Sequence, residues 1–204
     1  MSKLRRGSPI FRKLAIASFA GAALAGLLAL PATAQAPGET GYKRALMGKF
    51  AINFVNVQAQ YGSNIIASAL ETALKRSRDT VRTESKPVPE EVIRALTPFY
   101  KRETFEGVRY SVGDISPSGL AGFAIRNGNA AAVTLVDTIV FKDEDYVKNI
   151  ALWSHEMHHI EQYKEWGVTG FAARYAFGWT QVEEAAEAKA REFVAWYKDQ
   201  HGKN

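Results

Sequence analysis

The chain of 204 residues contains no cysteine. This absence excludes disulfide bonds, which an oxidising compartment would otherwise allow. It also excludes a lipoprotein anchor, because the lipid of a lipoprotein is attached to a cysteine. We therefore expect the stability of the fold to come from packing, alone or together with a bound metal ion.

Acidic residues are absent from the first 34 positions, which hold five basic residues (Lys3, Arg5, Arg6, Arg12 and Lys13). An apolar run over residues 14–30 follows, and Pro31 ends it before the small residues of Ala32-Thr33-Ala34. These features predict a secretory signal peptide over residues 1–34, cut after Ala34. An uncleaved membrane anchor is the alternative, since the run is just long enough to span a bilayer. The cleavage sequence favours an exported protein, periplasmic or secreted, that does not associate with membranes after cleavage.

Net charge is also absent once this segment is removed. The remaining 21 Lys and Arg equal the 21 Asp and Glu of the whole chain, so the sequence pI of about 9.4 comes from the targeting segment. Nucleic-acid binding would need a basic patch on the folded domain. We therefore expect no nucleic-acid partner.

Histidine is scarce, with four in the chain, yet three of them lie in the sequence His155-Glu156-Met157-His158-His159. This stretch contains the pattern His-Glu-x-x-His. On a helix, positions i and i+4 share a face, so His155 and His159 can bind one metal ion. Glu156 is placed to reach a water molecule at that metal and to act as the catalytic base. A chance match in a helix that contains histidine is the alternative to the metal site.

Periodicity predicts the surrounding elements. Apolar residues three or four apart predict a helical layer from Leu46 to Leu74, with a break near Gly62. A short helix is expected at 90–95, a strand at 108–112, a loop at 114–129 and a strand region at 130–141. Helices are expected from 143 to 166, with Gly167 as C-cap, and over 171–177 and 180–197.

These elements predict an α+β fold, mostly helical, with a small β-sheet packed beside the helix that carries the motif. The predicted organisation is a signal peptide at 1–34, a helical N-terminal segment at 35–86 and a domain at 87–204. The helical segment is expected to cover the core, with a helix on a membrane surface as the alternative.

A catalytic zinc site needs a third protein ligand. Glu183 and Glu187 of the last predicted helix share a face, whereas Glu184 points elsewhere. Thr180-Gln181-Val182-Glu183 is also a capping box, in which Glu183 would only cap its own helix. The residues alone leave Glu183 and Glu187 open as the third ligand. His158, at i+3 from His155, is expected beside the site or in a groove rather than as a ligand.

The motif through Tyr163, preceded by the strand region Val133–Phe141, resembles the DUF4157 family of metallopeptidase-like domains over about residues 88–192. Members of this family resemble small gluzincins, so the resemblance implies a gluzincin-like fold. It also implies that Glu183 of Glu183-Glu184-Ala185-Ala186-Glu187 is the third zinc ligand, with Glu187 orienting a ligand.

The predicted function is an exported zinc-dependent hydrolase of peptide bonds, acting on a peptide or protein substrate. Tyr163, Tyr175 and Arg174 are candidates for stabilising the oxyanion, and the sequence does not choose among them. The alternative is an exported module without catalysis, in which the same metal only holds helices together. The same residues also suit divalent ions other than zinc.

Overall fold

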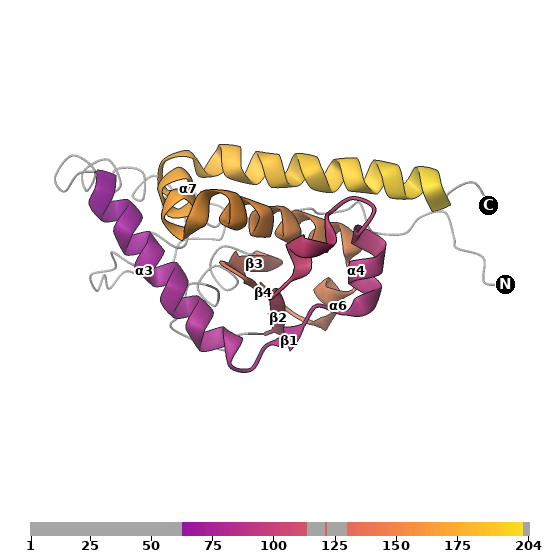
Figure 1. Ribbon diagram of the computed structural model, residues 1–204, viewed down its shortest axis with the longest axis horizontal. Coiled ribbons are helices and arrows are strands. Elements are labelled where there is room, and N and C mark those ends of the chain that lie inside the picture. Colours follow the sequence, from indigo (N-terminus) through magenta and orange to yellow (C-terminus); the bar gives the residue numbers. More distant parts are fainter. Residues whose placement is uncertain (1–62, 114–120, 122–129, 202–204) are drawn as a thin grey trace, which may run out of the picture.

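The computed structural model of the protein describes residues 63–113, 121 and 130–201 (Figure 1). The predicted signal peptide, most of the predicted helical segment at 35–86 and almost all of the predicted loop at 114–129 lie outside these residues. The domain boundaries therefore stay predictions.

The described chain is mostly helical and contains one small mixed sheet, which confirms the predicted fold class. Its elements, in chain order, are α3 (Ser63–Arg82), β1 (Lys86–Pro87), α4 (Glu90–Leu96), the 3₁₀ helix η2 (Arg102–Phe105), β2 (Arg109–Val112), β3 (Ala132–Leu135), β4 (Thr138–Phe141), α6 (Glu144–Val147) and α7 (Ile150–His201).

The sheet has the strand order β1-β2-β4-β3, which leaves β3 at one end. β2 is parallel to β4, and β3 is antiparallel to β4. Alternate residues of a strand face opposite sides of a sheet. Thr134 pairs with Ile139, so both side chains face the same side, while the paired Val133 and Val140 face the other.

The strand region predicted at 130–141 is a hairpin of two strands and not one continuous strand. Val136 and Asp137 form its turn, and Val136 has a positive φ of 59°, which is rare for a β-branched residue. The carboxylate of Asp137 accepts ion pairs from Arg78 at 3.1 Å and Arg82 at 3.0 Å. Both arginines belong to α3, so a distant helix holds this turn in place.

α7 is a chain of helical stretches interrupted at Gly167 (φ 68°) and Gly178 (φ −146°, ψ 37°). The first break agrees with the predicted cap at Gly167. The final stretch folds back and runs alongside the first, as the yellow and orange ribbons of Figure 1 show. The segments predicted as separate helices therefore return Glu183 to the neighbourhood of the motif.

The predicted helix at 143–166 is wrong at its start. The acidic residues at 143–145 begin only the short α6, in which the Asp143 side chain accepts bonds from the N–H groups of Asp145 and Tyr146. α7 then begins afresh after Asn149, whose side-chain oxygen accepts bonds from the N–H groups of Ala151 and Leu152 at 3.1 and 3.2 Å. Asn149 is therefore the N-cap of the helix that carries the motif.

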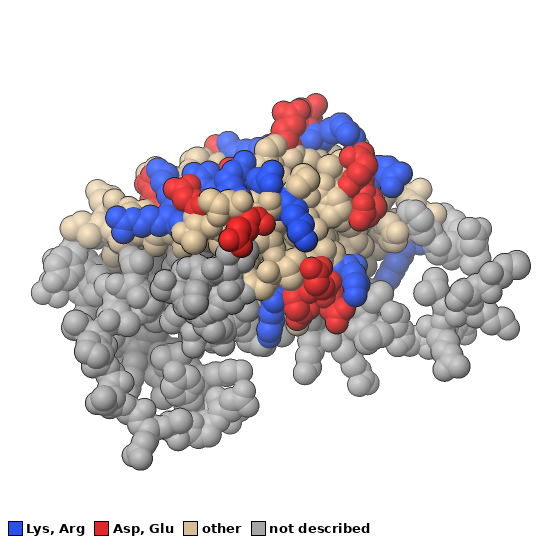
Figure 2. Space-filling view, turned by 90° about the horizontal axis from the view of Figure 1, so that it is seen from below, with Lys and Arg blue, Asp and Glu red and all other residues tan. Residues whose placement is uncertain are grey.

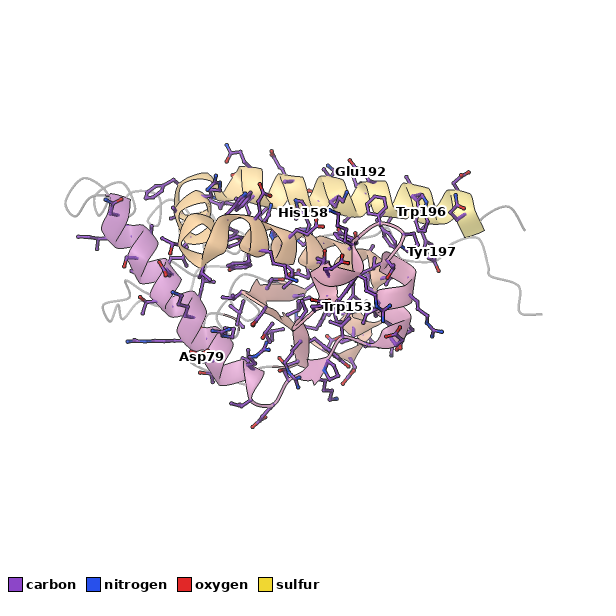
Figure 3. All side chains as sticks on the ribbon, in the orientation of Figure 1. Asp79, Trp153, His158, Glu192, Trp196 and Tyr197 are labelled. Atoms are coloured by element: carbon purple, nitrogen blue, oxygen red, sulfur yellow. The ribbon has the colours of Figure 1, made fainter. Side chains whose placement is uncertain are left out.

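Two apolar clusters occupy the two sides of the sheet. One contains Val133 and Val140 with apolar residues of α3 and of the middle of α7. The other contains Ile139 and Phe141 with Trp153 and residues of α4. The rings of Phe141 and Trp153 lie 4.6 Å apart, and Figure 3 shows Trp153 on the sheet side of α7. The first stretch of α7 is thus packed against the sheet next to the motif.

The surface carries charges of both signs, interspersed on the face that Figure 2 shows. Among the described residues, the large exposed apolar side chains are Ile65 and Phe177. Within this part of the chain, no helix combines the length and the apolar character that crossing a bilayer requires.

Replacing Asn149 by Ala should lower the free energy of unfolding by about 1 kcal/mol, because two N–H groups at the start of α7 lose their acceptor. Asn149→Asp keeps an acceptor and should stay close to wild type. Urea denaturation followed by circular dichroism measures both. Equal stability of Asn149→Ala and wild type would contradict this account of where α7 begins.

Candidate metal centre

The two motif histidines project from the first stretch of α7 toward one point. Their spacing of four residues places them on one face of the helix, as predicted. The two Nε2 atoms lie 3.2 Å apart, and the side chains of His155 and His159 are only 4% and 6% exposed. This distance suits a hydrogen bond in which one Nε2–H donates to the lone pair of the other, or two lone pairs that share a cation.

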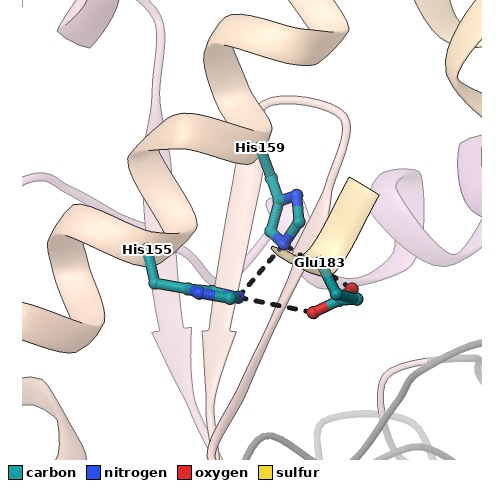
Figure 4. A group of neighbouring side chains, drawn as sticks. All are labelled: His155, His159 and Glu183. Carbon is teal, nitrogen blue, oxygen red and sulfur yellow. Dashed lines mark hydrogen bonds and ion pairs between the residues drawn. The ribbon is translucent and has the colours of Figure 1, made fainter. Parts of the chain in front are cut away.

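Glu183 of the last stretch of α7 closes the group (Figure 4). Its Oε2 lies 3.5 Å from Nε2 of His155, and its Oε1 lies 3.7 Å from Nε2 of His159. Bonds of about 2.0–2.1 Å to a tetrahedral zinc ion would hold their donor atoms about 3.3 Å apart. The distances of 3.2, 3.5 and 3.7 Å lie near this value, although the last two end on different oxygens of Glu183. One ligand atom from each residue lies within 4.8 Å of the others, so the three side chains could hold a divalent ion.

Glu187 does not take the place that the resemblance implied. It forms an ion pair of 2.7 Å with Arg191 near the surface, and its side chain is 38% exposed. Glu183 in turn does not serve only as a helix cap, because its carboxylate faces the two histidines and is 12% exposed. Of the two acids that the residues left open, the fold brings Glu183 to the motif.

Two further side chains orient the donors. The Oε1 atom of Gln162 lies 2.8 Å from Nδ1 of His159, so Nδ1 donates and Nε2 keeps its lone pair for a metal. The Gln162 amide donates to the carbonyl of Val182 at 3.4 Å, which ties it to the last stretch of α7. The Tyr175 hydroxyl donates to Oε1 of Glu183 at 2.6 Å.

Sequence reasoning assigned no role to Gln162 and listed Tyr175 only as an oxyanion candidate. One signal for Gln162 was available, since i+3 from His159 is a contacting position on a helix.

Glu156 is buried, with 3% of its surface exposed. Its Oε2 accepts a hydrogen bond of 2.6 Å from the hydroxyl of Thr134 on β3. Thr134 reaches it because the hairpin register turns Thr134 to the same side of the sheet as Ile139, which packs with the first stretch of α7. The predicted base is therefore held between the motif helix and a strand. Nothing in the sequence alone marked Thr134.

The electrostatics of the group favour a bound positive charge. Burial lowers the pKa of the His159 imidazole, but the Glu183 carboxylate outweighs this and raises the pKa to about 9. Burial also opposes ionisation of Glu183, yet the charges and hydrogen bonds of His159 and His155 hold its pKa well below the usual range. The metal-free group thus retains a proton at neutral pH, in the place where a cation would bind.

His158 and Arg174, two of the other residues considered from the sequence, lie apart from this group. His158 pairs with Glu161 at 3.3 Å and lines a cavity of about 1080 Å³ between the stretches of α7 (Figure 3), which agrees with its expected place in a groove. Arg174 lines the same cavity and stacks on the ring of Trp166 at 4.7 Å. The cavity is lined by Gln162 and Val182 but not by His155, His159 or Glu183.

Affinity for a divalent metal should rise with pH. His159 holds a proton below pH about 9, and a metal ion can bind Nε2 only when that proton leaves. One released proton corresponds to roughly a tenfold gain in affinity per pH unit below that value. Titration calorimetry with zinc at pH 6, 7 and 8, in buffers of different ionisation enthalpy, measures both the affinity and the proton release. Affinity independent of pH would contradict the charge balance described above.

A family model described as the eCIS core domain matches residues 87–167, a range that contains the motif but ends before Glu183. This family is related to DUF4157, which the motif region resembles. No curated protein and no solved structure matches the chain. The matched range thus covers the sheet and the motif stretch, while the acid that completes the group lies beyond it.

Proposed function

We propose that the protein is a zinc-dependent hydrolase of peptide bonds. The observation that carries the proposal is the group of His155, His159 and Glu183, in which one ligand atom from each residue lies within 4.8 Å of the others. The two Nε2 atoms lie 3.2 Å apart, and each of them has one Glu183 oxygen at 3.5 or 3.7 Å. Two histidines and one glutamate are a donor set of catalytic zinc sites, which keep a position for water or substrate. The match to the eCIS core domain over the motif is compatible with this proposal but does not specify a reaction.

In the proposed reaction, the metal ion and the residues of the chain have different roles. Bound zinc would lower the pKa of a water molecule to about 7 and polarise the scissile carbonyl. Glu156 takes the proton of the attacking water and passes it to the leaving nitrogen. The Thr134 hydroxyl fixes one carboxylate oxygen of Glu156, so the other oxygen serves in proton transfer.

A place for an extended substrate follows from the sheet. β3 lies at the end of the strand order, and its Thr134 touches the proposed base. A peptide that added itself to this edge would run beside Glu156 and would use backbone hydrogen bonds for binding. We propose a peptide or protein substrate and no nucleic-acid partner, and we also propose that the chain is exported. Membrane association after signal cleavage does not form part of the proposal.

Glu156→Gln should abolish peptide hydrolysis, with a loss of at least about 100-fold in kcat, because an amide cannot accept the proton. Its shape is kept, and the Gln oxygen can still accept from Thr134, so metal content and stability should change little. The assay is cleavage of casein and of a mixed peptide library by the mature zinc-loaded protein, with product detection by mass spectrometry.

Two results would contradict the hydrolase proposal. One is equal turnover by wild type and Glu156→Gln. The other is no turnover in wild type together with a large drop in melting temperature on chelation. The second result would instead support a metal-stabilised module without catalysis, in which Glu156 has no chemical role.

His155→Ala should bind zinc at least tenfold more weakly, because one of three donors is lost. Glu187→Gln is the matched control on the same chain, since its carboxylate pairs with Arg191 and lies outside the group. Elemental analysis after dialysis against a weak chelator compares the bound zinc. Full occupancy in His155→Ala, or equal loss in both variants, would remove the basis for the proposed site.

A further inference from the structure

The hydroxyl of Tyr163 is buried, and its proton has no hydrogen-bond acceptor among the described residues, although the peptide group of Val136 lies at the phenol oxygen. Tyr163 is 5% exposed. Buried hydroxyl groups are almost always satisfied, because an unpaired one loses its hydrogen bonds to water without replacement. A fold that retains one in a well-packed region therefore calls for an explanation.

The position of Tyr163 points to the metal centre. It follows His159 by four residues, so His155, His159 and Tyr163 succeed one another along one face of α7. Its ring stacks on Phe171 at 3.8 Å and 20°, and Phe171 stacks on Tyr175 at 5.3 Å and 15°. His159 meets Phe171 edge-on at 6.1 Å. The stack thus places two tyrosines around one phenylalanine that borders a metal-site histidine.

The charges of Glu156 and Glu183 act on the Tyr163 hydroxyl, as expected for a group near the metal centre. Burial raises the pKa of Tyr163 well above its ordinary value, the peptide group of Val136 partly opposes the shift, and the charges of Glu156 and Glu183 add to it. The phenol oxygen is therefore within electrostatic reach of both the proposed base and a proposed ligand. It also keeps its proton, so it can only donate to an anion.

The backbone beside the hydroxyl is strained. Val136 has a φ of 59° and packs against the cluster that contains Tyr163. Arg78 and Arg82 hold the neighbouring Asp137, as described above. Strained residues of this kind persist where the surroundings enforce them, and they concentrate at functional sites.

The other candidates for stabilising an oxyanion are engaged elsewhere. Tyr175 donates its proton to Glu183, and the guanidinium of Arg174 lies on Trp166. Of the three side chains that the sequence left open, Tyr163 alone combines burial near the centre with a hydroxyl proton that has no acceptor in the described structure.

We propose that Tyr163 is a further catalytic residue, whose hydroxyl donates a hydrogen bond to the oxyanion formed on the substrate carbonyl. The inference rests on the proposed hydrolase function. The water oxygen bonds to the carbonyl carbon, the π electrons move to the carbonyl oxygen, and the proton of the water passes to Glu156. The C–N bond then breaks, its electrons stay on nitrogen, nitrogen takes the proton from Glu156, and the carbonyl re-forms. Tyr163 stabilises the charge between these steps.

Tyr163→Phe tests the proposal, because it removes only the hydroxyl and keeps the stacked ring. We expect zinc content to stay at the wild-type level and the melting temperature to change little, because the ring and its stacking on Phe171 are kept and the hydroxyl proton has no acceptor to lose. We expect kcat/KM to fall by roughly 100-fold, the typical effect of removing one oxyanion donor. Affinity of the zinc-loaded protein for a phosphonate peptide analogue, which carries a tetrahedral anion, should fall by a similar factor.

Tyr175→Phe is the matched control from the same stack. Its hydroxyl orients Glu183, so its loss should weaken zinc binding, whereas Tyr163→Phe should not. This difference in zinc affinity separates a group that acts on the substrate from one that acts on a ligand.

The outcomes are distinguishable. If wild type cleaves peptides and Tyr163→Phe matches it in kcat/KM and in phosphonate affinity, the inference on Tyr163 is overturned and the hydrolase proposal stands. Loss of zinc in Tyr163→Phe would also overturn it, because the role would then be structural. Phosphonate affinity decides the question even if no tested peptide is cleaved. Wild type that neither cleaves peptides nor binds the phosphonate would overturn both proposals.

Discussion

The carboxylate of Glu183 between the two imidazoles is the interaction on which the rest of the structure depends. It joins two stretches of α7 that are far apart along the chain, and it does so inside the protein, at 12% exposure. Gly167, with its positive φ, and Gly178, with its non-helical backbone, allow the helix to change direction and return. Gln162 and Tyr175 then hold the imidazole and the carboxylate from either side.

Burial gives this group its chemical character. A carboxylate and two imidazoles taken out of water would lose much of their solvation, and the loss is offset only if positive charge is present among them. The raised pKa of His159 shows that a proton can supply this charge in the metal-free protein. A divalent cation would supply more charge and would engage all donors at once. A metal ion can therefore bind only as the proton leaves, so metal binding and proton release are coupled.

Much of the fold was predictable because its signals are local. The prolines around it and the acids of its first turn marked α4. Apolar spacing marked the motif stretch, alternation marked β2, and Gly167 marked a break. The hairpin at 132–141 was not predictable, because the β-branched Val136 takes a positive φ that such residues rarely adopt, and the turn depends on arginines of α3. The start of α7 was missed because Asp143 and Asn149 are equally good N-caps, and both are used.

The site was predictable as a set of residue types, but the choice between like residues was not. Helical periodicity places Glu183 and Glu187 on one face, and only the return of α7 decides which one meets the histidines. The same limit applies to Tyr163 and Tyr175. They lie on different stretches of α7, flank the same Phe171 and differ only in what their hydroxyls contact.

The composition of the group bears on whether a bound metal would serve catalysis or only stability. Structural zinc sites close their coordination with four protein ligands, whereas catalytic sites use three. Within residues 63–113, 121 and 130–201, the group consists of three donors, and no fourth His, Asp or Glu joins it. Glu156 has one oxygen fixed by Thr134, and the proton of the Tyr163 hydroxyl has no acceptor in that part of the chain. A site built only to join helices has no use for either feature. A site that moves protons and stabilises a developing negative charge would use both, and these two features are the reason for proposing catalysis rather than a purely structural metal.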